Sequence, residues 1–425
     1  MELAILVLTL VVTLVIGLPL PMCLAGASLA ALLAIGDLPL GMIPQRFVAG
    51  INSFAFMAIP FFLLVGQIMN EAGITKRIIA FSNALVGSLP GGLAQVNVLS
   101  SMFFGGISGS ATADTASIGS IMIPAMKREG YSGPFTVALT ACSSTCGPII
   151  PPSITLILYG IIAEVSITQL FLGGYVPGLM LGLGFLIMTY VISKRRNYPV
   201  YARASLSEIG RTARSASWAI VLPFLIIGGL LLGFFTVTEA AAVAVVYSLF
   251  VGIFIYRDLS IAALPRILFE TAVRVGALMT VAAGALVFAW VLTILEAPQM
   301  VAEWIFAIST NTIIILLLLN ILFLVIGMFM EAKAAMLILL PVILPVLPEL
   351  GIDPIHFGVV VVFNLLVGLV TPPVGLCLNL AAKIGDVPLN KAAAAALPFI
   401  AVQLIVLFLI TYIPGLVLWL PELAR

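Results

Sequence analysis

Two short stretches in the first half of the sequence cannot be continuous helices, although apolar residues surround them. Residues 105–115 have the sequence GGISGSATADT, and residues 146–153 have the sequence CGPIIPPS. Glycine and hydroxyl side chains weaken a helix in the first stretch, and three prolines within five residues remove backbone donors in the second. Unwound backbone at membrane depth is tolerated only where protein buries it or a water-filled cavity adjoins it. If the chain lies in a membrane, these stretches therefore predict a binding site.

The composition places the chain in a membrane. Of its 425 residues, 63% are hydrophobic and 8% are charged, whereas a soluble domain carries about 25% charged residues. Disorder is excluded as well, since it requires low hydrophobicity and high net charge. Residues 313–329 are nearly all apolar, which is unlike the alternating strands of an outer-membrane barrel. A net charge of +1 gives no sign of a nucleic-acid partner. We therefore expect an all-α polytopic protein in a lipid bilayer.

A basic segment in the middle of the chain predicts its orientation. Residues 194–214 hold six of the 18 basic residues and one acid, so the positive-inside rule places this loop in the cytoplasm. The N-terminus lacks the basic region of a cleaved signal peptide and is predicted to form the first membrane helix. Apolar candidate spans lie near residues 3–18, 20–36, 46–66, 170–192, 217–233, 236–256, 277–295, 311–329 and 396–419.

The two halves around this loop resemble each other at an offset of 221 residues. The matches keep one register over about 45 residues and pair Gly106 with Gly327, Pro124 with Pro345, Gly130 with Gly351, Gly147 with Gly368, and Pro151-Pro152 with Pro372-Pro373. In the second half the matching breaks are 327–333 (GMFMEAK) and 368–375 (GLVTPPVG). Secondary transporters are often built from such repeats, which are inverted when each half crosses the membrane an odd number of times.

The predicted organisation has two repeats and a connecting loop. Each repeat is expected to hold a re-entrant helical hairpin and a broken transmembrane helix beside its other helices. The ranges are 1–193 for the first repeat, with its hairpin near 90–127 and broken helix near 134–162; 194–214 for the cytoplasmic loop; and 215–425 for the second repeat, with its hairpin near 311–348 and broken helix near 355–381.

Charged residues inside these apolar surroundings are candidate site residues. Asp114 lies in the interrupted stretch 105–115, and Glu331 and Lys333 lie in the matching stretch 327–333 of the second half. We expect the two acids to bind a cation or compensate a charge, the alternative being helix capping. Lys333 is expected to pair with an acid or to extend to the membrane surface. Residues 70–87 and 259–276 are predicted to be amphipathic helices along the membrane surface.

In these residues the chain resembles the large membrane subunit (DctM or M subunit) of tripartite ATP-independent periplasmic (TRAP) transporters, within the wider ion-transporter superfamily. The similarity rests on GGISGSATADTASIGSIMIPAM, CGPIIPPS and TPPVGLCLNLAA. It implies a scaffold domain and a transport domain that moves like an elevator, driven by sodium, in the bacterial inner membrane. It also implies two partners: a small four-helix membrane subunit of the DctQ type and a periplasmic binding protein of the DctP type. That binding protein would deliver an organic acid such as a C4-dicarboxylate, a sialic acid or another sugar acid.

The resemblance also implies site residues. One sodium site would involve Ser108, Ser110, Asp114, Gly147, Ile150 and Pro152, and a second Gly327, Glu331, Gly368, Thr371 and Pro373. Substrate would lie near Ser108, Thr145, Thr371 and Asn379. Sodium is then the only metal and no organic cofactor is expected. Cys142 and Cys146 have helical spacing but no histidine or carboxylate close by in sequence, so we predict no transition-metal site.

Two alternatives remain open at this point. Residues 106–109 (GISG) match the pattern around the serine nucleophile of intramembrane proteases, but the only histidine, His356, follows a turn-like Asp353-Pro354 pair at an expected surface loop or helix start. The second alternative is a stand-alone sodium- or proton-coupled anion carrier that needs no binding protein. We expect a transporter rather than an enzyme.

Overall fold

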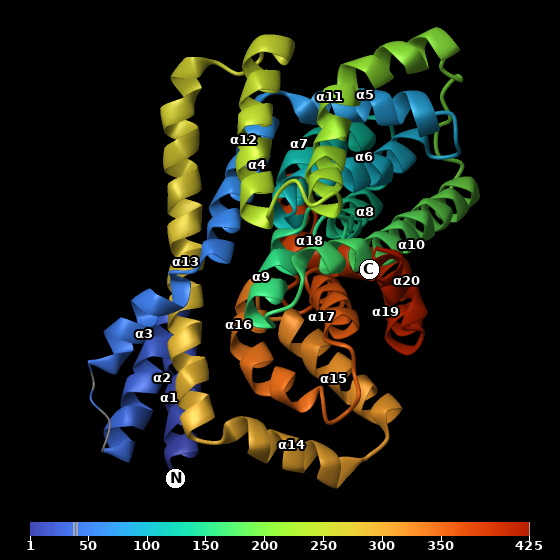
Figure 1. Cartoon of the computed structure of the whole chain (residues 1–425). Helices are drawn as coiled ribbons and strands as arrows, with labels where there is room; N and C mark the ends of the chain where they lie inside the picture. The colour runs from blue at the N-terminus through green and yellow to red at the C-terminus, as the bar shows by residue number, and fades with distance from the viewer. Residues whose placement is uncertain (37–38, 40, 425) are drawn as a thin grey trace.

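The computed structural model describes residues 1–36, 39 and 41–424, and over these residues it consists of helices without a strand (Figure 1). Helices begin where the sequence offers a side-chain cap. Ser132, Ser153 and Ser166 each accept a hydrogen bond from a backbone N–H of the helix that follows. The all-helical, polytopic part of the predicted fold class is confirmed.

The first half contains two short helices near the N-terminus, a longer scaffold of apolar helices and the two predicted broken regions. In chain order its helices are α1 (Glu2–Val15), α2 (Leu20–Ile35), α3 (Met42–Ile51), η1 (Phe54–Met57), α4 (Ala58–Glu71), α5 (Ile74–Val86), α6 (Gly92–Ser108), α7 (Ala111–Arg128), α8 (Gly133–Ser143), η2 (Ser144–Cys146), α9 (Ile154–Ile162) and α10 (Ile167–Arg195).

The second half begins with long apolar helices and ends with a second pair of broken regions. Its helices are α11 (Leu206–Leu231), α12 (Val237–Phe250), η3 (Val251–Tyr256), η4 (Ile261–Ala263), α13 (Leu264–Ile294), α14 (Ala297–Ile308), α15 (Thr312–Gly327), α16 (Ala332–Ile343), η5 (Leu344–Val346), α17 (Pro354–Gly368), α18 (Leu376–Gly385), α19 (Leu389–Tyr412) and α20 (Gly415–Leu423).

Several helices are long and apolar enough to cross a membrane. In the described part of the chain there are six, at 54–71, 167–195, 206–231, 237–256, 261–294 and 389–412, and a seventh if α14 and α15, which meet at 120°, form one bent span. Large apolar side chains on these helices face outward, among them Ile187, Phe224, Val246 and Phe269. Such a surface is compatible with lipid rather than with water. The protein is therefore a multi-pass membrane protein.

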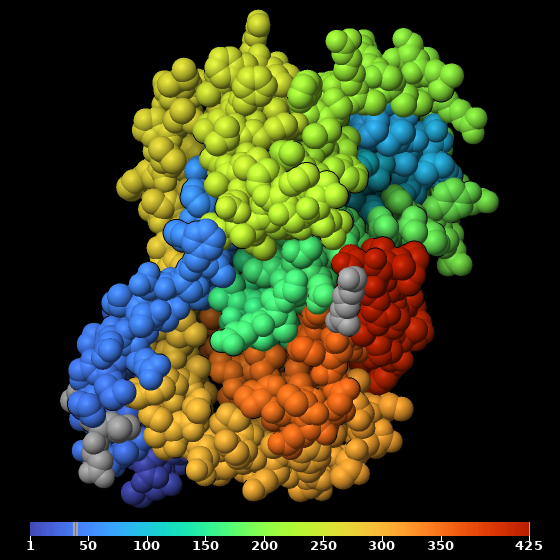
Figure 2. Space-filling model, viewed as in Figure 1, coloured from blue at the N-terminus to red at the C-terminus, as the bar shows by residue number. Residues whose placement is uncertain are grey.

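Two hairpins enter the molecule from opposite ends. The first hairpin, α6–α7, has its outer ends beside the basic loop, since the amide of Gly92 donates to the carbonyl of Pro199 (3.2 Å) and the amide of Ser132 to the Tyr198 hydroxyl (3.2 Å). The second hairpin, α15–α16, has its outer ends near α14, which lies at the other end of the molecule from α5 (Figure 1). Figure 2 shows the orange part of the second half, which contains α16 and α17, packed against the green segment of α9.

Local geometry also repeats between the halves. Gly130 and Gly351 both adopt a left-handed conformation, and each is followed two residues later by the residue that caps the next helix, Ser132 or Asp353. Both stand at the predicted offset of 221. The inverted relation of the complete halves stays a prediction.

Three expectations about helix boundaries were wrong. Residues 259–276 do not form a separate surface helix, because α13 continues without a break to Ile294. The short helix in this part of the chain is α14, which follows Glu296. The loop after α10 is shorter than 194–214, because Ser205 caps α11 and Arg211 and Arg214 lie on that helix. The span expected at 396–419 ends at Tyr412, before Pro414.

Contacts between glycines hold each hairpin on a broken helix. We call residues 147–153 the first break and residues 369–375 the second break. Gly105 of α6 meets Gly147 at the first break, and Gly327 of α15 meets Gly368 at the end of α17, so closely that a Cβ atom on Gly105 or Gly368 would overlap the partner's backbone. Only glycine permits backbones to approach this closely. The hairpin glycine of the second half, Gly327, thus corresponds to Gly105, one residue before the Gly106 that the sequence register selected.

Replacing Gly147 with alanine should separate the first hairpin from its break. We expect the melting temperature of the detergent-solubilised protein to fall, since overpacking destabilises by about 1–3 kcal/mol. The matched control is Gly210→Ala on α11, where a Cβ atom meets nothing within 4 Å. Equal melting temperatures for the Gly147→Ala and Gly210→Ala variants would contradict the importance of this contact.

Candidate functional site

The first hairpin borders a cavity of about 620 Å³, which we call the central cavity. Hydroxyl groups of Ser108, Ser110, Thr112 and Ser117 line one side of it. The rest of the lining comes from α4, α13 and the start of α16, and includes Gln67, Asn70, Arg274, Glu331 and Lys333. The cavity therefore combines an apolar wall with a few polar groups, as small-molecule sites do.

A much smaller space of about 10 Å³, the tip crevice, lies where both hairpins and both broken helices meet. Its lining includes Ser110 and Thr112 from the first hairpin and Glu331 and Lys333 from the second, and it extends to Pro148, Thr155, Leu366 and Leu369. This volume is about that of one water molecule. The two hairpin tips, more than 200 residues apart in the sequence, thus approach each other directly.

Hydrogen bonds shape the tip of the first hairpin. Gly109 ends α6 in a left-handed conformation, and the Ser110 hydroxyl caps α7 by accepting from the amide of Ala113 (3.4 Å). The Ser110 and Thr112 hydroxyls lie 3.2 Å apart. Gly109 also lies against the first break, near the carbonyl of Pro152 and the amide of Ile154.

Asp114 lies behind this tip, fully buried among α6, α7 and η2. The Ser101 hydroxyl donates to one of its carboxylate oxygens (3.4 Å) and also contacts the Ser143 hydroxyl (3.2 Å). The other carboxylate oxygen has no hydrogen-bond partner among the described residues. A buried carboxylate left in this way is strongly unfavourable unless a cation or proton compensates it. Asp114 does not act as the cap of α7, because Ser110 fills that role.

The first break provides further oxygen atoms. Within the described residues, the carbonyls of Gly147, Ile150 and Pro152 accept no hydrogen bond, whereas the Pro148 carbonyl accepts one from the Ser153 hydroxyl. Carboxylate, hydroxyl and carbonyl oxygens are ligands for hard cations. The oxygen ligands predicted for the first sodium site therefore suit such a cation. The structure places the tip of the first hairpin directly against the first break.

The second half differs from the first at the matching positions. Glu331 precedes α16 where Ser110 precedes α7, and its carboxylate pairs with Lys333, as one alternative for Lys333 predicted. The Gly368 carbonyl accepts from the amide of Thr371 (3.1 Å), and the Thr371 hydroxyl donates to the Val367 carbonyl (2.7 Å). The position equivalent to Asp114 is a buried alanine, Ala335. The second set of predicted sodium ligands, including Gly327 and Pro373, thus has no uncompensated carboxylate.

The predicted substrate residues are not all brought together. Ser108 lines the central cavity, but Thr145, Thr371 and Asn379 line neither this cavity nor the tip crevice. The Thr145 hydroxyl donates to the Cys142 carbonyl (2.7 Å) and accepts from Gln403 of α19 (2.8 Å). Thr145 is therefore a packing residue between η2 and α19 in this conformation.

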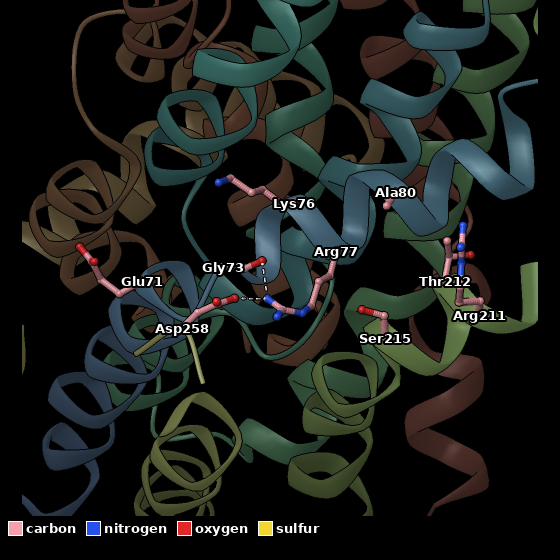
Figure 3. A pocket seen from close by; sticks show the side chains of 9 residues that line it. All are labelled: Glu71, Gly73, Lys76, Arg77, Ala80, Arg211, Thr212, Ser215 and Asp258. Atoms are coloured by element: carbon pink, nitrogen blue, oxygen red, sulfur yellow. Dashed lines mark hydrogen bonds and ion pairs between the residues drawn. The ribbon is translucent and has the colours of Figure 1, made fainter. Parts of the chain in front are cut away.

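A larger cavity of about 720 Å³ lies elsewhere, beneath α5 (Figure 3). We call it the α5 groove. In Figure 3, Arg77 points toward Asp258, with which it forms an ion pair (2.7 Å), while Lys76 and Arg211 extend from well-separated parts of the groove. None of the residues of the two breaks lines it. Its size alone does not make it the candidate site, because its polar groups do not converge.

The histidine and the two cysteines considered in the sequence lie buried in helices. His356 lies in the first turn of α17, a helix start as predicted, and its Nε2 is 2.8 Å from the Ile410 carbonyl. In the described ranges, no group of three or more His, Cys, Asp or Glu side chains could hold a metal ion. Cys142 and Cys146 are buried and free.

Comparison with known proteins identifies the family. The family model "Tripartite ATP-independent periplasmic transporter, DctM component" matches residues 7–416. The chain belongs to the DctM family. It is 39% identical over 407 residues to the sialic acid TRAP transporter large permease protein SiaM of Vibrio cholerae, covering 96% of this chain and 95% of that one. It is 43% identical over 369 residues to the C4-dicarboxylate TRAP transporter large permease protein DctM of Pseudomonas aeruginosa, covering 87% of this chain and 86% of that one.

A solved structure shares the fold of this DctM-family chain. The YdaH transporter of Alcanivorax borkumensis, described as having an unusual topology, matches with a TM-score of 0.63 and 16% identity over 88% of this chain and 89% of that one. The predicted family is confirmed, and so is the expectation of a transporter rather than an enzyme, because the relatives are TRAP permeases. The intramembrane protease is thereby rejected.

Several residues of the central cavity were missed in the sequence, among them Thr112, Ser117 and Arg274. Thr112 and Ser117 belong to the hydroxyl-rich run of the first hairpin and could have been included by their helical spacing. Arg274 was missed because it was assigned to a surface helix, whereas it lies on the long span α13.

Breaking the Glu331–Lys333 pair should destabilise the second hairpin tip, because removing either charge leaves the other one partly buried and without a partner. We expect the single variants Glu331→Gln and Lys333→Met each to lower the melting temperature in detergent. The double variant should lose less than the sum, corresponding to a coupling free energy of at least about 0.5 kcal/mol. Additive losses would show that the pair contributes nothing.

Proposed function

We propose that this chain is the large membrane subunit of a sodium-coupled secondary transporter that takes up an organic acid delivered by a periplasmic binding protein. The observation that carries sodium coupling is Asp114, a fully buried carboxylate with one oxygen lacking a partner and with hydroxyl groups next to it. Sodium as a co-transported ion would satisfy this oxygen together with carbonyls of the first break. Relief of the buried charge then links ion binding to ordering of the first hairpin.

The arrangement of the hairpins supports an elevator mechanism. The two hairpins enter from opposite ends of the molecule, and their tips meet at the tip crevice. A site between two such tips becomes accessible to one side or the other when the hairpins and broken helices move together past the remaining helices. Such movement is compatible with α4 and α13, which contribute the opposite wall of the central cavity.

The substrate class follows from the relatives and the chemistry of the cavity. Similar proteins are named for sialic acid, C4-dicarboxylate and 2,3-diketo-L-gulonate, which are all carboxylic acids. The hydroxyls of Ser108, Ser110 and Thr112 can donate to carboxylate oxygens. Membership of the family supports three further parts of the proposal: a DctQ-type small subunit, a DctP-type binding protein, and a place in the bacterial inner membrane with the basic loop in the cytoplasm.

Reconstitution tests this proposal directly. Proteoliposomes with both partner proteins should accumulate a radiolabelled acid such as succinate or N-acetylneuraminate when a sodium gradient is imposed, because sodium binding near Asp114 supplies the driving force. A potassium gradient is the control and should not support uptake. Full uptake by this chain without the partner proteins would favour the stand-alone carrier instead.

Asp114→Asn should weaken sodium binding while keeping the side-chain shape. We expect sodium chloride to raise the melting temperature of the unaltered protein relative to potassium chloride. In the variant this rise should be lost, and the sodium concentration for half-maximal uptake should increase about tenfold or more, as expected when a charged ligand is removed. The control is Glu129→Gln, an exposed acid just after α7. Unchanged sodium dependence in Asp114→Asn would contradict its role.

A further inference from the structure

Arg274 is a charged residue of α13 whose side chain lines the central cavity. It directly precedes the uncharged run 275–294 and lies about 12 Å along the helix axis from Arg266 at 1.5 Å per residue. Its side chain is exposed. Charged residues that face a cavity beside membrane-spanning helices mark candidate paths of a substrate or ion.

The acids nearest to Arg274 along α13 and α4 are already engaged. Glu270, one turn away, accepts a hydrogen bond from Gln67 (2.7 Å) and lies 3.8 Å from Arg266. Arg266 also pairs with Glu71 (2.8 Å). Among the described residues, Arg274 forms no ion pair. Its guanidinium, with five donors, is therefore free to bind an anion.

One positive charge in the lining of the central cavity, that of Arg274, is not balanced by an acid of the same lining. The other two charged residues there, Glu331 and Lys333, form a pair and neutralise each other. Arg274 is thus the one uncompensated charge in the described lining of this cavity, which it shares with the hydroxyl residues of the first hairpin. A carboxylate between them could accept from the guanidinium and from the hydroxyls, which is a strong form of hydrogen bonding.

The cavity continues toward the basic loop. It shares Asn70, Ala116 and Ser117 with a neighbouring cavity of about 350 Å³, which in turn shares Gly73 and Lys76 with the α5 groove. In that groove the basic residues exceed the acids, since Lys76 and Arg211 have no acidic partner among the described residues. Basic residues thus outnumber acidic ones in the lining of these three cavities, and the α5 groove includes Arg211 of the segment that the positive-inside rule assigns to the cytoplasm.

From this arrangement we infer that Arg274, on a helix outside both hairpins, is a substrate-binding residue that recognises the carboxylate of the transported acid. The inference rests on the proposed function and names a residue of the same site. Because Arg274 belongs to α13 and not to a hairpin, its contact with the acid exists only while the hairpin tips face the central cavity. Arg274 then selects for anionic substrates and holds them before release toward the basic loop.

Uptake measurements with Arg274→Gln and Arg274→Lys test the inference. With both partner proteins and a sodium gradient, Arg274→Gln should lower uptake of radiolabelled succinate and N-acetylneuraminate about tenfold or more, the loss of one charge-assisted contact. Arg274→Lys keeps the charge and should lose less. The sodium concentration for half-maximal uptake should not change in either variant. The control is Arg214→Gln, an exposed arginine on α11 that lines none of the described cavities.

A thiol-labelling experiment gives a readout that does not depend on transport or on the identity of the acid. Ser117→Cys places a thiol in the central cavity, while the four native cysteines are buried. An anionic methanethiosulfonate (sulfonatoethyl) should react faster than a cationic one (trimethylammonium-ethyl). Adding Arg274→Gln should lower this rate ratio about threefold or more, because a unit charge in the same cavity acts oppositely on the two reagents. Adding Arg214→Gln should leave the ratio unchanged.

The outcomes separate the two proposals. Absence of sodium-driven uptake by the unaltered protein would contradict the proposed function, and the labelling ratio would still decide whether Arg274 creates an anion-attracting cavity. Normal uptake by Arg274→Gln with an unchanged labelling ratio would overturn the role of Arg274 and leave the proposed function intact. Monodisperse elution of Arg274→Lys in detergent, with a normal melting temperature, guards against misfolding as the cause of a loss.

Discussion

The structure depends on one constraint, which is that backbone unwound within a membrane must find partners inside the protein. Glycine residues permit this close contact at both broken helices. Gly105 against Gly147, and Gly327 against Gly368, bring a hairpin into direct backbone contact with a broken helix, so that hydrocarbon does not surround the unpaired carbonyls. The Pro152 carbonyl of the first break also lies next to Gly109 of the first hairpin. Burial of the first break therefore brings its backbone oxygens to the place where we propose the ion site.

The two halves use this common frame for different chemistry. In the first half, Asp114 is buried with an unpartnered oxygen beside hydroxyl groups. In the second, the acid has moved to the hairpin tip as Glu331, and Lys333 neutralises it. A free buried carboxylate favours binding of a cation, whereas a neutral pair at the tip avoids attracting one. Repetition of the backbone pattern thus does not require repetition of the ligand set.

The electrostatics of the central cavity complement that of Asp114. The Asp114 carboxylate is fully buried, while Arg274 lines the cavity from another helix. The proposed cation and the proposed acidic substrate would therefore be bound by different groups.

The sequence by itself determined the class of protein, the family and the places where the chain unwinds. These follow from local chemistry, because proline and glycine interrupt helices wherever they stand and 8% charge cannot cover a soluble surface. Residues such as Thr112 could have been added from the same pattern. The tertiary structure alone decided which charges are compensated. It paired Glu331 with Lys333, left one oxygen of Asp114 without a partner, and turned Arg274 from an expected surface helix into a cavity. The physical reason is that the environment of a charge is set by helices far apart in the sequence, and their packing is not encoded in any single segment.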